Sequence, residues 1–139
     1  MKYIFLTNQF YIDYQHCTEI EQKVERPYVQ AYININGVDF AVPFRSEINH
    51  PHVLWTDKEN KCGLDFSKAV VIEHRDYIDT TLKPYIRPNE HAALIGKEFI
   101  VISGLLKYIE RYKKAKTKSD KRSKQLLQYS TLQYFEKYL

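Results

Sequence analysis

Hydrophobic and polar positions alternate along two neighbouring stretches of the chain, residues 28–35 and 38–44. A period of two is typical of β-strands that bury one face. Asn36-Gly37 separates the two stretches, and Asn-Gly is the strongest short signal for a two-residue hairpin turn. The pattern predicts a β-hairpin, with Pro43 close to a strand end or at a sheet edge because proline donates no hydrogen bond to the ladder.

Further strands are predicted on both sides of this hairpin. Residues 2–7 are rich in Tyr, Ile and Phe, and residues 68–73 form a compact apolar run that is typical of a buried strand. Residues 45–63 are predicted to form a long loop, because Asn, Pro and Gly recur along them. For residues 8–26 a loop and a short helix both remain open.

The C-terminal part of the chain changes to helical periodicity. Apolar residues recur at spacings of three and four through residues 90–114, after Asn89 as a candidate N-cap, and again through residues 125–138. The first stripe consists of Leu94, Ile95, Phe99, Ile102, Leu105, Leu106 and Ile109. Strands followed by helices predict an α+β fold, and the length favours a single domain over residues 1–139.

The composition argues against several classes of protein. Cys17 and Cys62 are far apart and lack a Cys-x-x-Cys spacing, so they predict neither a disulfide framework nor a zinc site. No apolar run approaches the roughly 20 residues of a membrane span. We therefore expect a cytoplasmic protein that uses no metal or other cofactor and has no membrane partner.

Positive charge is concentrated in one segment. Residues 107–124 contain nine Lys or Arg residues and two acidic residues, whereas the whole chain has a net charge of +4, so the remainder is net acidic. This segregation predicts a contact surface for nucleic acid, and a solvated helix end remains an open alternative. The candidate RNA-binding residues here are Lys107, Arg111, Lys113, Lys114, Lys116, Lys118, Lys121 and Arg122.

The stretch after the hairpin contains groups that can bind phosphate and transfer protons: Arg45, Ser46, His50 and His52. Cleavage of RNA without a metal needs a base for the 2′-OH proton, an acid for the leaving 5′ oxygen and cations for the phosphoryl charge. Imidazole titrates near neutral pH, and guanidinium binds phosphate through two donors. The four residues are therefore candidate catalytic residues. A pair of surface histidines beside a turn-capping serine is the simpler alternative.

Several short motifs follow one another in a distinctive order. They are Arg26-Pro27-Tyr28, Phe40-Ala41-Val42-Pro43-Phe44-Arg45-Ser46 and the ending Tyr129-Ser130-Thr131-Leu132-Gln133-Tyr134-Phe135-Glu136. Their order and spacing resemble the type III toxin–antitoxin ribonucleases, the ToxN, AbiQ, CptN and TenpN toxins. Two further stretches, residues 45–50 and 63–72, look most like the TenpN branch.

This resemblance implies a compact, partly barrel-like antiparallel sheet with helices, related to the Kid and MazF toxins. It implies a metal-independent endoribonuclease that leaves a 2′,3′-cyclic phosphate and a 5′-hydroxyl. It also implies inhibition by a repetitive, pseudoknotted RNA antitoxin. The toxin processes that RNA and assembles with it into a closed, cyclic RNA–protein complex.

The resemblance also assigns individual residues. Ser46 falls on the active-site serine of the family, Arg45 on the polar residue before it, and Arg26 on a basic residue ahead of the second strand. ToxN-type toxins have a lysine two positions after the serine, where this chain has Ile48. His50 is the nearest substitute for that lysine, and His52 is the second.

We therefore expect an RNA-cleaving toxin in which His50 transfers protons and Ser46 and Arg45 hold the phosphate. Arg26, Tyr28 and the basic segment are expected to bind antitoxin or target RNA, with tyrosines stacking on unpaired bases. The alternatives are a non-catalytic RNA-binding module that uses the same basic segment, and a module that binds an acidic protein.

Overall fold

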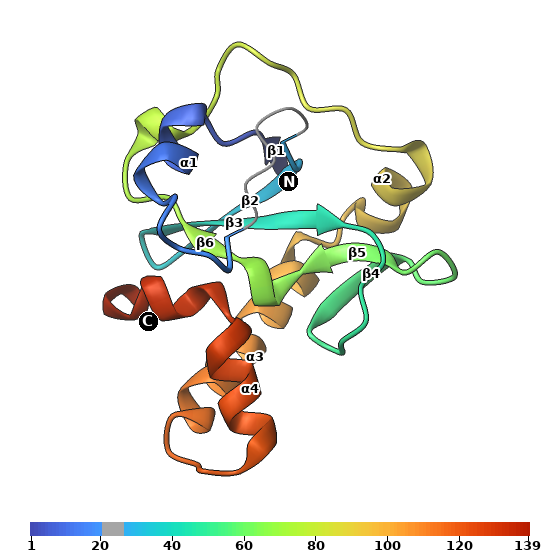
Figure 1. The fold of residues 1–139 in the computed structure, drawn as a ribbon. Coiled ribbons are helices and arrows are strands. Elements are labelled where there is room, and N and C mark those ends of the chain that lie inside the picture. The colour runs from blue at the N-terminus through green and yellow to red at the C-terminus, as the bar shows by residue number, and fades with distance from the viewer. Residues whose placement is uncertain (21–26) are drawn as a thin grey trace.

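The computed structural model describes residues 1–20 and 27–139. In this part of the chain the strands are β1 (Lys2–Ile4), β2 (Gln30–Ile35), β3 (Val38–Arg45), β4 (Val53–Asp57), β5 (Cys62–Asp65) and β6 (Val70–Val71). The α-helices are α1 (Asn8–Asp13), α2 (Pro88–Leu94), α3 (Glu98–Ala115) and α4 (Lys121–Tyr129). The 3₁₀ turns are η1 (Phe66–Lys68), η2 (Arg75–Tyr77), η3 (Thr131–Tyr134) and η4 (Glu136–Tyr138). The predicted α+β class with an antiparallel sheet and C-terminal helices is confirmed (Figure 1).

The sheet is open, with the strand order β1-β2-β3-β5-β4 and with β6 paired to β3. Strand β3 is central: it pairs with β2 along one edge, and along the other with β6 at Phe40-Ala41 and then β5 at Phe44-Arg45. Pro43 lies near the end of β3, as predicted. The Phe44 N–H donates to Val29 O on the β2 side of the strand. Successive residues of a strand direct their N–H groups to opposite edges, so the nitrogen of Pro43 faces the other edge. There it lies between the residues that pair with β6 and those that pair with β5, and no hydrogen bond of the ladder is lost.

The predicted hairpin around Asn36-Gly37 is confirmed. These two residues have φ values of 51° and 85°, and positive φ at both positions is what a type I′ turn requires. The register pairs Ile35 with Val38 and continues to Gln30 opposite Pro43. The other two predicted strands are shorter than expected: Lys2–Ile4 forms β1, and only Val70–Val71 pairs within residues 68–73.

The predicted loop over residues 45–63 is wrong in its second half, where β4 and β5 form a hairpin. Its strands are five and four residues long, and the turn-forming residues around them dominate the local pattern. Pairing of β5 with β3, which is distant in sequence, stabilises this hairpin. Gly63 is required there, because a Cβ would lie 2.4 Å from Leu54 O.

The predicted single helix over residues 90–114 is divided into α2 and α3. Gly96 lies in the break with a φ of 69°, and a left-handed glycine is a common way for a helix to end. Helix α2 begins at Pro88, so the N-cap position is Arg87 and not Asn89. The break also rotates part of the predicted stripe outwards, and the side chains of Ile95 and Phe99 are exposed.

Helix α3 packs directly on the sheet-side turn η1. A Cβ at Gly104 would lie 2.6 Å from the ring tip of Phe66, so glycine allows α3 and η1 to approach this closely. On both sides of Gly104 the buried face of α3 contains Val101, Leu105, Tyr108, Ile109, Tyr112 and Ala115. This contact brings η1 beside the basic half of α3.

The second predicted helix, over residues 125–138, begins and ends earlier, as α4. Asp120 caps its start by accepting a hydrogen bond from Ser123 N at 3.2 Å. Ser130 ends it in an extended conformation, and its Oγ accepts from Leu132 N at 3.2 Å. Helices α3 and α4 together form a hairpin that projects from one side of the sheet (Figure 1).

Buried apolar side chains from the sheet, α1, α3 and the C-terminal turns form one hydrophobic cluster among the described residues. None of the described helices combines the length and the apolar character needed to cross a membrane.

Candidate active site

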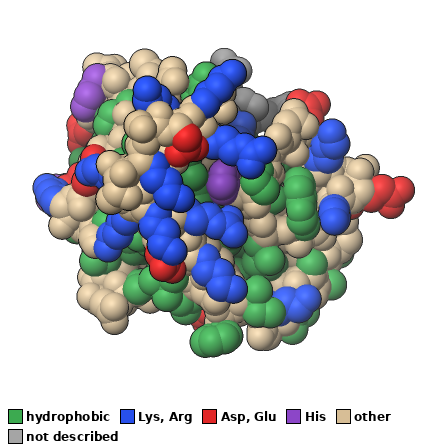
Figure 2. Space-filling view, turned by 90° about the horizontal axis from the view of Figure 1, so that it is seen from below, with side chains coloured by type: hydrophobic (Ala, Val, Ile, Leu, Met, Phe, Trp, Pro, Cys, Tyr) green, Lys and Arg blue, Asp and Glu red, His purple; other side chains and the backbone are tan. Residues whose placement is uncertain are grey.

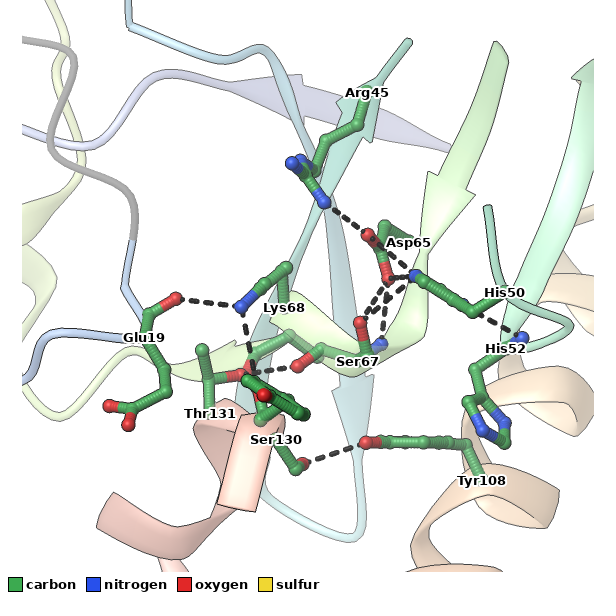
Figure 3. A network of polar contacts seen from close by, with 12 residues as sticks. Glu19, Arg45, His50, His52, Asp65, Ser67, Lys68, Tyr108, Ser130 and Thr131 are labelled. Carbon is green, nitrogen blue, oxygen red and sulfur yellow. Dashed lines mark hydrogen bonds and ion pairs between the residues drawn. The ribbon is translucent and has the colours of Figure 1, made fainter. Parts of the chain in front are cut away.

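The buried carboxylate of Asp65 lies at the centre of the candidate site (Figure 3). Asp65 is the last residue of β5 and is 0% exposed. Its oxygens accept hydrogen bonds from Arg45 Nη1 at 2.7 Å, from Ser67 Oγ at 2.6 Å and from Ser67 N at 2.9 Å. His50 Nε2 lies 3.2 Å from both carboxylate oxygens.

Strand register explains why Arg45 reaches Asp65. Arg45 at the end of β3 is paired with Gly63 of β5, and cross-strand partners point to the same face of a sheet. Asp65 is two residues beyond Gly63 and so shares that face. The Arg45 side chain therefore reaches the carboxylate along this shared face, with Nη1 2.7 Å from Asp65 Oδ2.

Backbone contacts at the end of β5 position the two histidines. Phe66 N donates to His52 O at 3.0 Å, which anchors the segment just before β4. His52 N donates to His50 Nδ1 at 3.0 Å, so Nδ1 is an acceptor and the ring proton of neutral His50 is on Nε2, facing Asp65. The two imidazole rings stack with centroids 5.6 Å apart, and the His52 ring lies 5.2 Å from the ring of Tyr108.

Ser67, His50 and Asp65 do not form a hydrolase triad. In such a triad the acid contacts Nδ1 of the histidine and the serine contacts Nε2. Here Ser67 Oγ lies 3.3 Å from His50 Nε2, the same nitrogen that faces Asp65, and the hydroxyl donates to Asp65. The arrangement orients Arg45 and His50, and it does not activate Ser67 as a nucleophile.

The surroundings lower the pKa of two groups in the site, Asp65 and His52. Burial on its own would raise the pKa of Asp65, but hydrogen bonds from His50, Ser67 and Arg45 outweigh it and hold that pKa below its ordinary value. Burial lowers the pKa of His52, and the nearby His50 and Arg111 lower it further, against a smaller opposing effect of Asp65. At pH 7 we therefore expect an ionised Asp65 and a neutral His52.

These groups open into a groove of about 1010 Å³ between the sheet edge and the α3–α4 hairpin. Six Lys or Arg residues line the groove, and none of the acidic residues in the described part of the chain lines it. The six are Arg45, Lys68, Arg111, Lys114, Lys118 and Arg122. Figure 2 shows Lys and Arg side chains gathered around a histidine on this face of the molecule.

The structure brings together three of the four predicted catalytic residues. Arg45, His50 and His52 line the groove, whereas Ser46 is exposed and does not line it. Ile48, where a related toxin would have lysine, is 3% exposed and points into the protein. The serine that contacts His50 is Ser67.

The predicted RNA-binding residues divide into two groups. Arg111, Lys114, Lys118 and Arg122 line the groove. Four others are exposed on the helical hairpin outside the groove lining, namely Lys107, Lys113, Lys116 and Lys121. Lys116 forms an ion pair with Glu136.

Of the two N-terminal candidates, Tyr28 does not line the groove. The Tyr28 ring lies 6.0 Å from the Arg45 guanidinium and lines a smaller pocket that shares Arg45 and Lys68 with the groove. The prediction for Arg26 lies outside the described residues.

Sequence reasoning did not select Asp65, Ser67, Lys68 or Tyr108 as site residues. A weak signal for Asp65 and Ser67 exists: an acidic residue directly after the apolar stretch 62–64, with serine two positions later, is a typical side-chain cap of a turn. Tyr108 had no such signal, because it reads as one more core position of an amphipathic helix.

No cluster of three or more His, Cys, Asp and Glu side chains suited to a metal ion occurs within residues 1–20 and 27–139. No protein family model, curated protein or solved structure matches the chain. The case for a function therefore depends on the geometry of the site and on the sequence motifs.

The central role of Asp65 can be tested by replacing it with asparagine, which keeps the shape and removes the charge. Arg45 and His50 then lose the carboxylate that their donors face, and we expect the free energy of unfolding at pH 7 to fall by about 2–4 kcal/mol. Because the folded-state pKa of Asp65 is below its unfolded value of about 3.9, wild type has this advantage above that pH and loses it as the pH falls through the folded pKa.

Urea unfolding of both proteins between pH 7 and pH 2 measures this difference. Asp76→Asn is the matched control, because Asp76 is exposed in η2, and it should leave stability unchanged. Equal stability of Asp65→Asn and wild type at pH 7 would contradict the account.

Proposed function

We propose that this protein is a metal-independent endoribonuclease. One observation carries the proposal. Six cations and two histidines line the groove, and no acidic residue does so among those described. The groove lies over the buried carboxylate of Asp65, which orients Arg45 and His50. A groove of this charge attracts a polyanion, and the groups at its floor are those that metal-free RNA cleavage needs.

The helical hairpin supplies the binding of the RNA backbone. Arg111 and Lys114 are three residues apart on α3 and so lie along one face of that helix, and Lys118 follows in the turn that joins α3 to α4. Arg122 is in the first turn of α4, which contains no acidic residue. A cation at a helix N-terminus is unfavourable by about 0.3–1 kcal/mol, so helix stability does not explain the position of Arg122. Binding of a phosphate group does explain it, because helix N-termini bind anions.

Arg45 and the two histidines supply the chemistry. Arg45, held by Asp65, stabilises the negative charge that develops on the phosphoryl oxygens. His52 is neutral at pH 7 because of its lowered pKa, and it accepts the proton of the 2′-OH as that oxygen attacks phosphorus. His50 acts in its imidazolium form: it protonates the 5′ oxygen as the P–O5′ bond breaks and is left as neutral imidazole. The products are a 2′,3′-cyclic phosphate and a 5′-hydroxyl, with no net consumption of water.

A cleavage assay on single-stranded RNA in the presence of EDTA tests this proposal. We expect wild type to produce fragments with cyclic phosphate and 5′-hydroxyl ends. His50→Ala and Arg45→Ala should each lower the rate by roughly 100-fold or more, because each removes a group that acts in the transition state. His16→Ala is the matched control, since His16 is exposed and does not line the groove, and it should cleave like wild type.

The same assay separates the two serines. The family resemblance predicts that Ser46→Ala loses activity, whereas the contacts of Ser67 favour a loss in Ser67→Ala. RNA that is retarded on a gel but remains intact would instead support the non-catalytic RNA-binding module. Full activity of both His50→Ala and Arg45→Ala would show that the site is elsewhere.

We further propose, from the sequence motifs, that the ribonuclease is the toxin of a cytoplasmic type III toxin–antitoxin system. Its inhibitor would then be a repetitive, pseudoknotted RNA that the toxin processes and that joins it in a closed, cyclic complex. The basic groove supports this proposal, because a toxin of this kind must hold RNA both as substrate and as inhibitor.

RNA that co-purifies with the protein from its own cells tests the antitoxin proposal. We expect a single short species, cut from a tandem repeat, with a 5′-hydroxyl and a 2′,3′-cyclic phosphate at its ends. A heterogeneous mixture of cellular RNA fragments, or no RNA, would contradict the antitoxin proposal and leave the ribonuclease proposal standing on its own assay.

A further inference from the structure

The two walls of the groove differ in chemistry. The α3 wall presents Arg111 and Lys114, with Lys118 in the turn that follows the helix. The α4 wall begins with Arg122 and continues with Leu126 and Tyr129, which follow at spacings of four and three and so share one helix face. Both walls therefore contribute cations, and only the α4 wall adds this aliphatic and this aromatic side chain.

The Tyr129 side chain is exposed, but the backbone that carries it is fixed. The tyrosine is 59% exposed. Its carbonyl accepts a hydrogen bond from Lys68 Nζ at 3.3 Å. The next residue, Ser130, is 1% exposed, and its Oγ accepts from the buried Tyr108 hydroxyl at 2.7 Å. With the backbone fixed, only the two side-chain torsions of the tyrosine remain to be ordered when a ligand binds to the ring.

Lys68 connects Tyr129 to the catalytic cluster. Lys68 follows Ser67 in the same 3₁₀ turn, and Ser67 contacts both Asp65 and His50. Lys68 also donates to Glu19 O at 3.1 Å, so it joins three segments of the chain (Figure 3). A ligand in contact with the Tyr129 ring would thus lie in the same groove as a phosphate held at Arg45.

We propose that Tyr129, with Leu126 beside it, is a stacking platform for one unpaired base of the bound RNA, next to the phosphate that is cleaved. This inference rests on the proposed function and names its substrate class as single-stranded RNA. An aromatic ring can stack only on a base whose face is free, and bases in a duplex already stack on their neighbours. The α3 cations then hold the backbone, and Tyr129 holds the base.

The platform can be tested by binding, separately from catalysis. The probe is a short single-stranded RNA of mixed sequence with 2′-O-methyl groups, which removes the attacking hydroxyl and prevents cleavage, measured by fluorescence anisotropy. We expect Tyr129→Phe to bind like wild type, because stacking needs the ring alone. Tyr129→Ala should bind about 10-fold to 100-fold more weakly. Tyr85→Ala is the matched control, because Tyr85 is 75% exposed and does not line the groove.

A 2-aminopurine placed in the probe gives a direct readout of stacking. Wild type and Tyr129→Phe should quench its fluorescence at one position of the RNA, and Tyr129→Ala should not. A duplex of the same sequence should bind more weakly than the single strand and be insensitive to Tyr129→Ala. Thermal unfolding of each variant establishes that it is folded; an exposed side chain such as Tyr129 should be replaceable without loss of the fold.

The failures of the two proposals are distinguishable. If wild type cleaves RNA, and Tyr129→Ala binds the probe and quenches its fluorescence as wild type does, the stacking platform is wrong. The ribonuclease proposal then still stands. A preference of wild type for the duplex would also overturn the platform. Wild type that neither binds nor cleaves RNA would remove both.

Discussion

The site depends on one constraint, the ionised carboxylate of Asp65 buried at the end of β5. A buried charge is unfavourable unless donors surround it, and here Arg45, His50 and Ser67 supply them from three segments of the chain. The requirement works in both directions: the donors hold Asp65 ionised, and Asp65 fixes the direction of the guanidinium and of the imidazole. Removing the carboxylate would therefore release both groups that face the groove.

The same few residues that hold the carboxylate also attach the helical hairpin to the sheet. The turn η1 begins with Phe66, whose ring lies against Gly104 of α3, continues with Ser67, and ends with Lys68, which donates to the carbonyl of Tyr129 in α4. Thr131 Oγ1 donates to the carbonyl of Ser67, which ties the C-terminal segment to the same turn. The groove exists because the sheet edge and the hairpin meet at η1, so the charge of the hairpin faces the oriented Arg45 and His50.

Local sequence determined the parts of the fold that local rules govern. Asn36-Gly37 predicted the hairpin because both of its positive φ angles suit those residues, and the basic segment 107–124 predicted the charge of the groove wall. The β4–β5 hairpin was missed because its short strands depend on pairing with β3, and the break at Gly96 was missed because the apolar period continues across it. Three predicted catalytic residues meet in the groove. The sequence marked Asp65 and Ser67 only as a turn cap, because their contacts with Arg45 and His50 depend on the register of β3 against β5 and on the backbone contact between Phe66 and His52.

The central claim is that the groove over Asp65 holds RNA with a phosphate between Arg45 and the cations of α3. Chemical-shift mapping of the protein with a non-cleavable 2′-O-methyl RNA tests it most directly. The account predicts that the largest changes fall on the side chains of Arg45, His50 and His52 and on the groove-facing residues Arg111, Lys118 and Arg122. Changes confined to exposed residues outside the groove, such as Lys107 and Lys113, would contradict it.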